Sequence, residues 1–317
     1  MNTPVHNLRL EAFTVAAYIT AYEDAEALNA CVAAIQTQTF AVAQILIVDN
    51  SEHPLVLTPC LQNNDTILIW SHPENLGIAG GLELAFNWAD RQGYDFLWTF
   101  DQDSTPEPDC LARLLETYIH LVKQDCNPGI VAPAAIDSRT GQIVQPSRFL
   151  GDRFRGFQPS DPTISYECDA PITSGSLVQM RAARQIPPPD RNLFMDGIDL
   201  DYGLRLRKAG FQNFVVPAAR MYHRFGTPLQ IELFGWKRVF QCYSPLRYYY
   251  ICRNQTYLEL RHATGVYRFT CFLRRINYLA LTICKILVLD PESKAHKINA
   301  CLTGTYHGLI GKLGKCW

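Results

Sequence analysis

Acidic residues stand at the ends of apolar segments in this 317-residue chain. Asp101 and Asp103 are one residue apart and follow the largely apolar segment 95–100, whose sequence is DFLWTF. Two carboxylates at this spacing can face one hard cation, and Mg²⁺ or Mn²⁺ favours a few carboxylates together with phosphate oxygens and water. The spacing therefore predicts a divalent-metal site. A pair of loop acids that make turn hydrogen bonds is the alternative.

A second group of acids, Asp196, Asp199 and Asp201, lies just before or inside the start of a predicted helix. A carboxylate there can act as a general base that takes a proton from an attacking hydroxyl group. Helix capping explains the same residues, because acids favour the positive end of the helix dipole. His223 follows a predicted strand, where it is either a metal ligand or a structural histidine.

Three glycines occur in the segment ENLGIAGG, residues 74–81, at the start of a predicted helix. Backbone N–H groups at such a position can hold a phosphate group. The segment matches neither the dinucleotide-binding glycine pattern nor the P-loop pattern. Close packing of a helix on a sheet explains the glycines almost as well.

The first half of the sequence alternates between predicted strands and predicted helices, which indicates an α/β fold with a mostly parallel sheet and helices on both faces. We expect strands at 14–20, 44–49, 66–70 and 95–101, and helices at 25–36, 78–91 and 109–123. Ligands of open α/β sheets bind beyond the carboxyl ends of the strands. Thr20, Asp49 and Asp101 stand at three such ends, and Tyr22 follows the first of them.

The pattern changes after residue 129, where short strands, proline and glycine dominate up to residue 189. A helix is predicted at 200–209, closed by Gly210, and a strand at 213–216. Strand signals then end near residue 225. Two domains are therefore expected, one over residues 1–225 and a basic, aromatic, helical one over residues 226–317.

The charges are distributed unevenly, although 29 basic residues nearly balance 30 acidic residues. Residues 1–202 carry 11 basic and 26 acidic groups, and residues 203–317 carry 18 basic and 4 acidic groups. Arginines alternate with aromatic residues such as Tyr248–Tyr250 and Phe272, which suits an anionic membrane surface. A helical cap or a homodimer interface is the alternative. Nucleic-acid binding is not expected, because the acidic half would repel a phosphate backbone.

Composition restricts the class of protein further. With 48% hydrophobic residues, the chain can bury a full core. The 11 cysteines are scattered without a Cys-x-x-Cys pair, which argues against a zinc cluster or a disulfide framework and predicts a reducing, cytoplasmic environment. The apolar stretch 276–289 contains Lys285 and is too short to span a bilayer. It can lie on a membrane surface.

Taken in order, these segments resemble the family 2 glycosyltransferases of the GT-A fold, and in particular the bacterial rhamnosyltransferase branch that builds cell-surface polysaccharides. The resemblance covers nearly the whole chain, and its residues 247–253 and 308–315 are similar to that branch too. The segments that carry it are YITAY (18–22), VDNS (48–51), NLGIAGG (75–81), DQDS (101–104), TSG (173–175), FMDGIDLDYGLR (194–205) and YH (222–223).

The resemblance implies a role for each of these residues. Asp49 would bind the nucleotide base, and Ser174 and Gly175 would face the donor sugar or the acceptor. Asp101, Asp103 and His223 would hold a metal ion on the diphosphate. Further nucleotide-binding positions would be Thr20, Tyr22, Asn75, Gly77 and Gly80.

The catalytic base implied by the resemblance is Asp199, with Asp196 as the second candidate. Gly197 stands where many relatives carry an acidic or aromatic residue. Within the first predicted domain, residues 1–104 would form the nucleotide-binding half and residues 105–225 the acceptor half.

The implied function is a metal-dependent inverting transfer of a sugar from a nucleotide-diphosphate donor. dTDP-rhamnose is the favoured donor, and the acceptor would be a lipid-linked saccharide at the inner membrane face, as in O-antigen synthesis. Such a protein would be peripheral on the cytoplasmic side of the membrane, with Mg²⁺ or Mn²⁺ as its cofactor.

Three other functions remain open at the level of sequence. A galactofuranosyl or other hexosyl transferase would use a UDP-sugar. A non-catalytic relative would bind the nucleotide sugar without converging catalytic residues. A nucleotidyltransferase would carry a glycine-rich loop near the N-terminus, and residues 15–22 contain no glycine.

Overall fold

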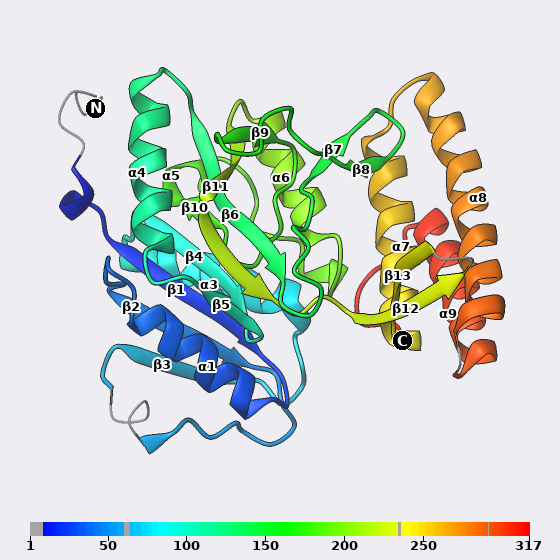
Figure 1. The fold of residues 1–317 in the computed structure, drawn as a ribbon, viewed down its shortest axis with the longest axis horizontal. Coiled ribbons are helices and arrows are strands. Elements are labelled where there is room, and N and C mark those ends of the chain that lie inside the picture. The colour runs from blue at the N-terminus through cyan, green and yellow to red at the C-terminus, as the bar shows by residue number, and fades with distance from the viewer. Residues whose placement is uncertain (1–8, 60–63, 234–235, 291) are drawn as a thin grey trace. The chain divides into compact units, whose positions relative to one another are not determined.

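The computed structural model divides the chain into two compact units (Figure 1). It describes residues 9–59, 64–233, 236–290 and 292–317. The first unit consists of Met1–Arg148, Gly156–Arg191 and Asp199–His223. The second consists of Phe149–Arg155, Asn192–Ile198 and Arg224–Trp317. Two short segments from within the first 225 residues therefore belong to the second unit, and one of them carries Asp196.

The first unit is built on one mixed sheet with strand order β3-β2-β1-β4-β10-β6-β11-β5, and β9 pairs with β11. Strands β3, β2, β1 and β4 are parallel to one another, as are β6 and β11, whereas β10 and β5 run antiparallel to their neighbours. The strands are β1 (Val15–Ala21), β2 (Gln44–Asp49), β3 (Ile67–Ser71), β4 (Phe96–Asp101), β5 (Ser104–Pro106), β6 (Pro128–Asp137), β9 (Tyr166–Cys168), β10 (Leu177–Gln179) and β11 (Gln212–His223). The predicted mostly parallel sheet is confirmed.

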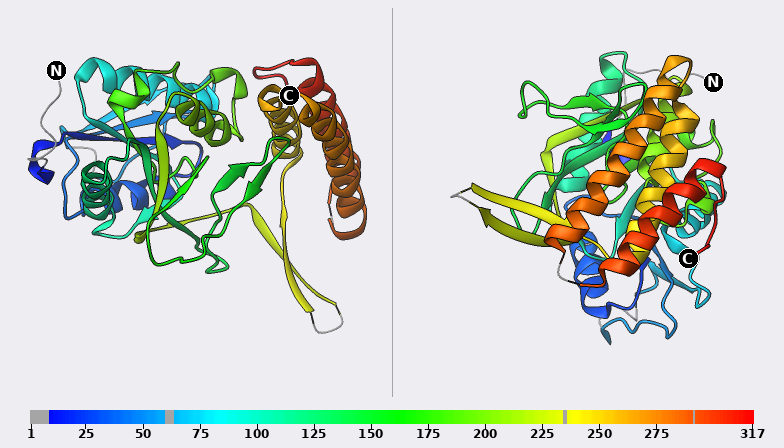
Figure 2. Two further views of the ribbon diagram at one scale, coloured as in Figure 1. Left: turned by 90° about the horizontal axis from the view of Figure 1, so that it is seen from above. Right: turned by 90° about the vertical axis from the view of Figure 1, so that its right-hand side faces the viewer.

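Helices cover both faces of this sheet, with α1 and α4 on one face and α3 and α6 on the other (Figure 2). Helix α1 shows why: its apolar residues recur every three or four positions, so Leu28, Cys31, Val32 and Ile35 are buried together. The helical elements of this part are η2 (Leu10–Ala12), α1 (Ala25–Gln36), α3 (Gly77–Gln92), α4 (Cys110–Lys123), α5 (Met180–Ala183) and α6 (Ile198–Lys208). The short helix η3 (Arg191–Leu193) lies where the chain passes from the first unit to the second.

Strand β11 is longer than the sequence pattern predicts. The expected strand at 213–216 continues to His223, after a register shift between Val216 and Arg220 against β6. Pro217 marks the point where the pattern ends, because proline cannot donate a ladder hydrogen bond. An irregularity in the strand absorbs this residue and lets pairing resume. The extension is what brings His223 to the carboxyl end of the sheet.

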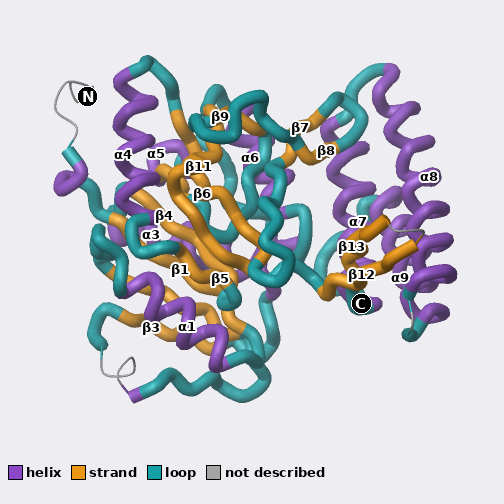
Figure 3. The backbone as a smooth tube through the Cα atoms, viewed as in Figure 1, coloured by secondary structure: helices purple, strands orange, loops and turns teal. Residues whose placement is uncertain are grey.

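The second unit contains three long helices and a hairpin, drawn in purple and orange in Figure 3. The helices are α7 (Pro245–His262), α8 (Val266–Leu289) and α9 (Lys294–Ile310), and the hairpin consists of β12 (Thr227–Leu233) and β13 (Trp236–Cys242). A further short hairpin pairs β7 (Ser147–Phe149) with β8 (Phe154–Gly156). The helical prediction is confirmed, but the prediction that strand signals end near residue 225 is wrong for β12 and β13.

Helices α7 and α9 pack closely because α9 has glycine at two contact positions. A Cβ atom on Gly304 would collide with the backbone oxygen of Tyr249, and one on Gly308 with that of Arg253. The three tyrosines Tyr248–Tyr250 are at most 4% exposed and form the core of this unit with Phe194. They are therefore not the interfacial aromatics that the sequence pattern allowed. Among the described residues, no helix combines the length and apolarity needed to cross a membrane.

Candidate active site

The carboxyl ends of three parallel strands bring the predicted nucleotide-binding residues to one edge of the sheet. In the register of β1, Thr20 lies opposite Asp101 of β4, and Ala21 lies opposite Asp49 of β2. Backbone hydrogen bonds between the strands thus fix the relative positions of these residues. This is the edge at which open α/β sheets bind ligands.

Asp49 is 1% exposed and shapes the loop that follows it. Its Oδ1 accepts a hydrogen bond from the Ser51 N–H group at 3.0 Å, and its Oδ2 accepts one from the Leu55 N–H group at 2.7 Å. A carboxylate offers about four acceptor positions, so both oxygens retain capacity for a further donor. The neighbouring Asn50 side chain accepts a hydrogen bond from the Leu76 N–H group at 2.9 Å. Asn50 thereby connects this loop to the start of α3.

The turn before α3 has the backbone shape that its residue types favour. Asn75 has a positive φ of 54°, its side-chain oxygen accepts a hydrogen bond from the Gly77 N–H group at 2.9 Å, and Gly77 has a φ of 69°. A Cβ atom on Gly80 would lie 2.9 Å from Leu76 Cβ, and one on Gly81 would collide with the buried Tyr18 hydroxyl. Close packing of α3 therefore accounts for the glycines at 80 and 81.

Two hydrogen bonds connect the backbone of Tyr22 to a side chain of the loop after β4. Its N–H group donates to Gln102 Oε1 at 2.7 Å, and Gln102 Nε2 donates to the Tyr22 carbonyl oxygen at 2.7 Å. The Tyr22 side chain is 49% exposed, as a ring that stacks on a ligand would need to be. Gln102, which lies between the two acids of the Asp-x-Asp motif, thus joins two predicted binding loops.

A chain of hydrogen bonds connects both acids of that motif to His223. Ser174 Oγ accepts a hydrogen bond from the Asp101 N–H group at 3.0 Å and lies 2.6 Å from Ser104 Oγ. Ser104 Oγ in turn lies 2.8 Å from His223 Nδ1, and Asp103 Oδ1 lies 3.1 Å from the same nitrogen. The pairing of β5 with β11 places Ser104 opposite His223.

These residues form a compact group of chemically useful side chains. Ser104 and Ser174 are almost completely buried, and His223 is 9% exposed. Among the described residues, no three or more His, Cys, Asp or Glu side chains are grouped to hold a metal ion. Asp103 and His223 nevertheless come together as a pair of potential ligands. Ser104 was missed as a site residue, because its role depends on a strand pairing that joins positions 119 residues apart.

Gly175 is required by its surroundings. Its φ is 79°, and a Cβ atom there would lie 2.7 Å from both Met221 Sδ and Pro133 Cγ. Its N–H group donates to the Thr99 carbonyl oxygen at 2.7 Å, and its own carbonyl oxygen accepts from Trp98 Nε1 at 2.9 Å. The turn that carries Ser174 is thus attached to the backbone and core of β4.

Asp199 lies in the first turn of α6 and is half-buried. Its Oδ1 accepts a hydrogen bond from the Leu200 N–H group at 2.9 Å. This position lies at the positive end of the helix dipole. Asp201, the third acid of the group, is 1% exposed and pairs with Arg205 four residues later at 2.7 Å. Asp201 therefore has a structural role within α6.

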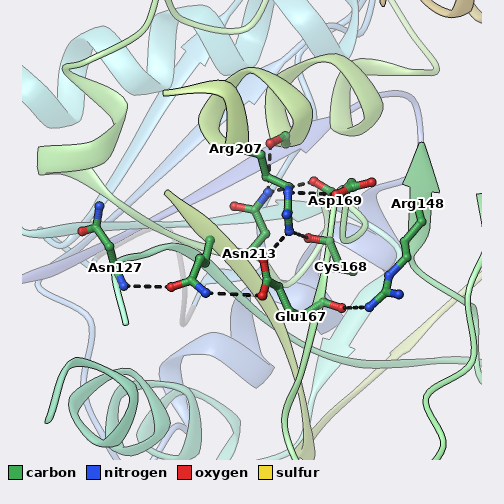
Figure 4. Close-up of polar contacts among 9 residues, drawn as sticks. Asn127, Arg148, Glu167, Cys168, Asp169, Arg207 and Asn213 are labelled. Carbon is green, nitrogen blue, oxygen red and sulfur yellow. Dashed lines mark hydrogen bonds and ion pairs between the residues drawn. The ribbon is translucent and has the colours of Figure 1, made fainter. Parts of the chain in front are cut away.

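A polar network on β9 and β11 holds the other end of α6 (Figure 4). Arg207 forms ion pairs with Glu167 and, at 2.8 Å, with Asp169. Asn213 Nδ2 donates to the carbonyl oxygens of Asp169 at 2.8 Å and Gly203 at 2.9 Å. These contacts fix the orientation of the helix that carries Asp199.

Asp196 belongs to the second unit, in the segment Asn192–Ile198. Burial raises the pKa of its carboxyl group, and Arg247, whose Nε lies 3.4 Å from Oδ1, partly offsets that rise. The backbone around it is unusual, since Phe194, Asp196 and Gly197 all have positive φ angles. Such a conformation costs free energy at the two non-glycine residues and needs strong restraint from its surroundings.

Two buried side chains of α7 supply that restraint. Asn254 Nδ2 donates to the carbonyl oxygens of Leu193 at 2.9 Å, Met195 at 2.6 Å and Asp196 at 2.8 Å. Arg253, which is also completely buried, donates from Nη2 to the Leu193 carbonyl oxygen at 2.9 Å. The sequence pattern does not reveal either role, because the acceptors are backbone atoms about sixty positions away along the chain.

Comparison with known proteins identifies the class of enzyme. Residues 17–168 match the model described as glycosyl transferase family 2. The chain is a glycosyltransferase with a family 2 domain over these residues. Along 300 residues it is similar to the dTDP-rhamnosyl transferase RfbF of Shigella flexneri, with 23% identity over 94% of this chain and 96% of that protein. The donor of this glycosyltransferase is a nucleotide sugar.

Solved structures share its fold. A crystal structure of GalNAc-T7 with UDP, GalNAc and Mn²⁺ superposes with a TM-score of 0.58 at 13% identity, over 95% of this chain and 58% of that one. S. aureus TarS superposes with a TM-score of 0.54 at 11% identity, over 90% of this chain and 48% of that one. This glycosyltransferase thus spans about half the length of both. The predicted GT-A fold is confirmed.

The contacts of Asn254 lead to a prediction about stability. We expect Asn254→Ala to lower the free energy of unfolding by about 1–3 kcal/mol, because buried carbonyl groups lose their donor. Chemical denaturation measures the change. Asn277→Ala, at an exposed position on α8, is the matched control and should change stability by no more than about 0.5 kcal/mol. Equal effects of the two substitutions would contradict the assigned role.

Proposed function

We propose that this glycosyltransferase moves L-rhamnose from dTDP-rhamnose to a saccharide acceptor, with inversion at the anomeric carbon, in the synthesis of a bacterial cell-surface polysaccharide. The choice of donor is supported by the similarity to a dTDP-rhamnosyl transferase along nearly the whole chain. The observation that carries the chemistry is the hydrogen-bonded group of Asp101, Ser174, Ser104, His223 and Asp103 at the carboxyl edge of the sheet.

Binding of the nucleotide is assigned to the ends of β1 and β2 and to the turn before α3. Asp49 would accept a hydrogen bond from the base, and Asn75 and Gly77 would line the pocket. Thr20 and Tyr22 lie on the same edge, with the exposed Tyr22 ring available for stacking. We assign Ser174 and Gly175 to the side that faces the sugar or the acceptor.

The diphosphate is assigned to Asp101, Asp103 and His223 together with Mg²⁺ or Mn²⁺. The 3.1 Å approach of Asp103 Oδ1 to His223 Nδ1 gives a carboxylate and an imidazole within reach of one cation. Mg²⁺ typically takes one or two protein ligands and fills its other positions with phosphate oxygens and water, so this donor set fits. When bound, the cation neutralises charge that develops on the leaving diphosphate.

The proton transfer is assigned to Asp199. The acceptor hydroxyl oxygen forms a bond to the anomeric carbon while the bond to the diphosphate breaks, and the diphosphate leaves with the electron pair. The hydroxyl proton passes to the Asp199 carboxylate. Asp199 is half-buried in the first turn of α6. Asp196, which is largely buried beside Arg247, is the second candidate.

The acceptor is proposed to be a lipid-linked saccharide at the inner face of the cell membrane. The supporting observation is the basic balance of residues 203–317, which suits an anionic lipid surface. Homodimer formation through the same region is the alternative.

Two other functions are compatible with the family. One is transfer of galactofuranose or another hexose from a UDP-sugar, since the GalNAc-T7 crystal structure contains UDP. The other is a relative that binds nucleotide sugar without catalysis. The convergence of Asp103 with His223 favours an enzyme over the second of these.

A donor panel tests the proposed activity. We expect nucleotide-diphosphate release from dTDP-rhamnose to exceed release from UDP-sugars and to stop when the divalent cation is chelated. Asp103→Ala and His223→Ala should each lower kcat/KM by at least about 100-fold, because charge neutralisation in the transition state is lost. Asp65→Asn, at an exposed turn, is the control. Wild-type turnover in either site variant would refute the metal assignment.

The two candidate bases are distinguished by isosteric substitution. Asp199→Asn should lower kcat by about 10²- to 10⁴-fold, the range that general-base catalysis supplies. Asp196→Asn should retain kcat within about tenfold, because the amide still fills the buried site beside Arg247. Single-turnover measurements with saturating donor separate the two variants. The reverse order of effects would assign the base to Asp196.

A further inference from the structure

Helix α8 carries an apolar stripe on the side that faces away from its own core contacts. Its buried residues are Cys271, Arg275, Thr282 and Ile286, which recur at intervals of four and seven. A second set of apolar residues lies on the opposite side, one group in the first half of the helix and one near its C-terminal end, and all of its members are exposed. They are Phe269 (65%), Phe272 (41%), Leu273 (51%), Ile276 (42%), Leu287 (51%) and Val288 (76%).

This stripe is larger than the scattered apolar residues of an ordinary protein surface. Single exposed apolar side chains need no explanation, whereas a continuous row of them indicates an interaction surface. Helix α9, which packs beside α8 in the second unit (Figure 2), adds an exposed row of its own. That row comprises Leu302, Tyr306, Leu309 and Ile310.

The charges around the stripe are positive. Residues 266–289 contain Arg268, Arg274, Arg275 and Lys285 and no aspartate or glutamate. Arg275 is buried against Glu259, whereas Arg268 and Arg274 are exposed, and Arg274 also pairs with Asp152 at 2.6 Å. Lys312 and Lys315 after α9 are exposed as well. Apolar residues on one side of a helix with arginine and lysine at its borders are typical of helices that lie in a membrane interface.

We propose that α8 docks in the plane of an anionic lipid bilayer, with the row from Phe269 to Val288 inserted below the headgroups. Docking would place the enzyme beside a lipid-linked acceptor, so its role in the cell rests on the proposed function. The exposed stripe and its charges support docking independently of the proposed catalytic residues.

A bilayer fits this face better than a second copy of the chain. In a two-fold symmetric dimer, the patch meets a copy of itself, so a face of α8 without acidic residues would meet an equally basic face. Two basic faces repel each other, whereas phosphatidylglycerol headgroups attract one. The exposed rings of Tyr267, Phe269 and Tyr306 also suit the interface, where aromatic side chains are enriched.

Vesicle co-sedimentation of the full chain tests the proposal. One set of vesicles is an equal mixture of phosphatidylglycerol and phosphatidylcholine, and the other is phosphatidylcholine alone. We expect binding to the anionic vesicles that weakens when salt is raised. Replacing Phe269, Leu273 and Ile276 together by Gln should lower the partition coefficient by at least about 100-fold, since each loses apolar burial. Because these positions are exposed, the variant should keep the wild-type circular dichroism spectrum.

Matched controls make the outcome decisive. Ile143→Gln with Ile164→Gln removes exposed apolar residues of the first unit and should leave vesicle binding unchanged. Equal binding of the α8 variant and the wild type, or equal binding to neutral and anionic vesicles, would overturn the proposal. So would a wild-type dimer in light scattering that the α8 variant dissociates. Vesicle binding does not require catalysis, so Asp199→Asn should bind vesicles as the wild type does. If no donor is turned over, the proposed function fails but the vesicle result still tests docking.

Discussion

The parallel register of β1, β2 and β4 is the constraint on which the candidate active site depends. Backbone hydrogen bonds place Thr20, Asp49 and Asp101 at one edge, where the loops after each strand meet. Hydrogen bonds then connect these loops, for example between the Gln102 side chain and the backbone of Tyr22. A slip of one residue in this register would turn every side chain of a strand to the opposite face.

A second constraint comes from β11, which returns along the sheet to the same edge. Its pairing with β5 places His223 beside Ser104 and Asp103. Ser174 then connects Ser104 to the backbone of Asp101. Residues that are far apart in the sequence thus form one hydrogen-bonded group. Within the second unit, Asn254 holds the backbone on both sides of Met195.

Local patterns in the sequence were sufficient to predict the elements of the first half. Helix α1 and strand β2 have their predicted bounds, because apolar periodicity and the acids at their ends are local signals. The extension of β11 beyond Val216 and the hairpin of β12 and β13 are not predicted, since proline and charged residues interrupt their patterns. Asp103 and His223 were chosen from motifs, and the structure brings them together. Ser104, Arg253 and Asn254 act through partners that only the tertiary structure supplies.

We propose that the Asp103 and His223 side chains help to bind the diphosphate of the donor at the carboxyl edge of the sheet. The most direct test is a crystal structure of the protein with dTDP and Mn²⁺, with the cation located by its anomalous scattering. We predict a manganese peak in contact with Asp103, His223 and the diphosphate, and the thymine ring beside Asp49. A diphosphate bound away from the ends of β1, β2 and β4, or a manganese ion that contacts neither Asp103 nor His223, would contradict the account.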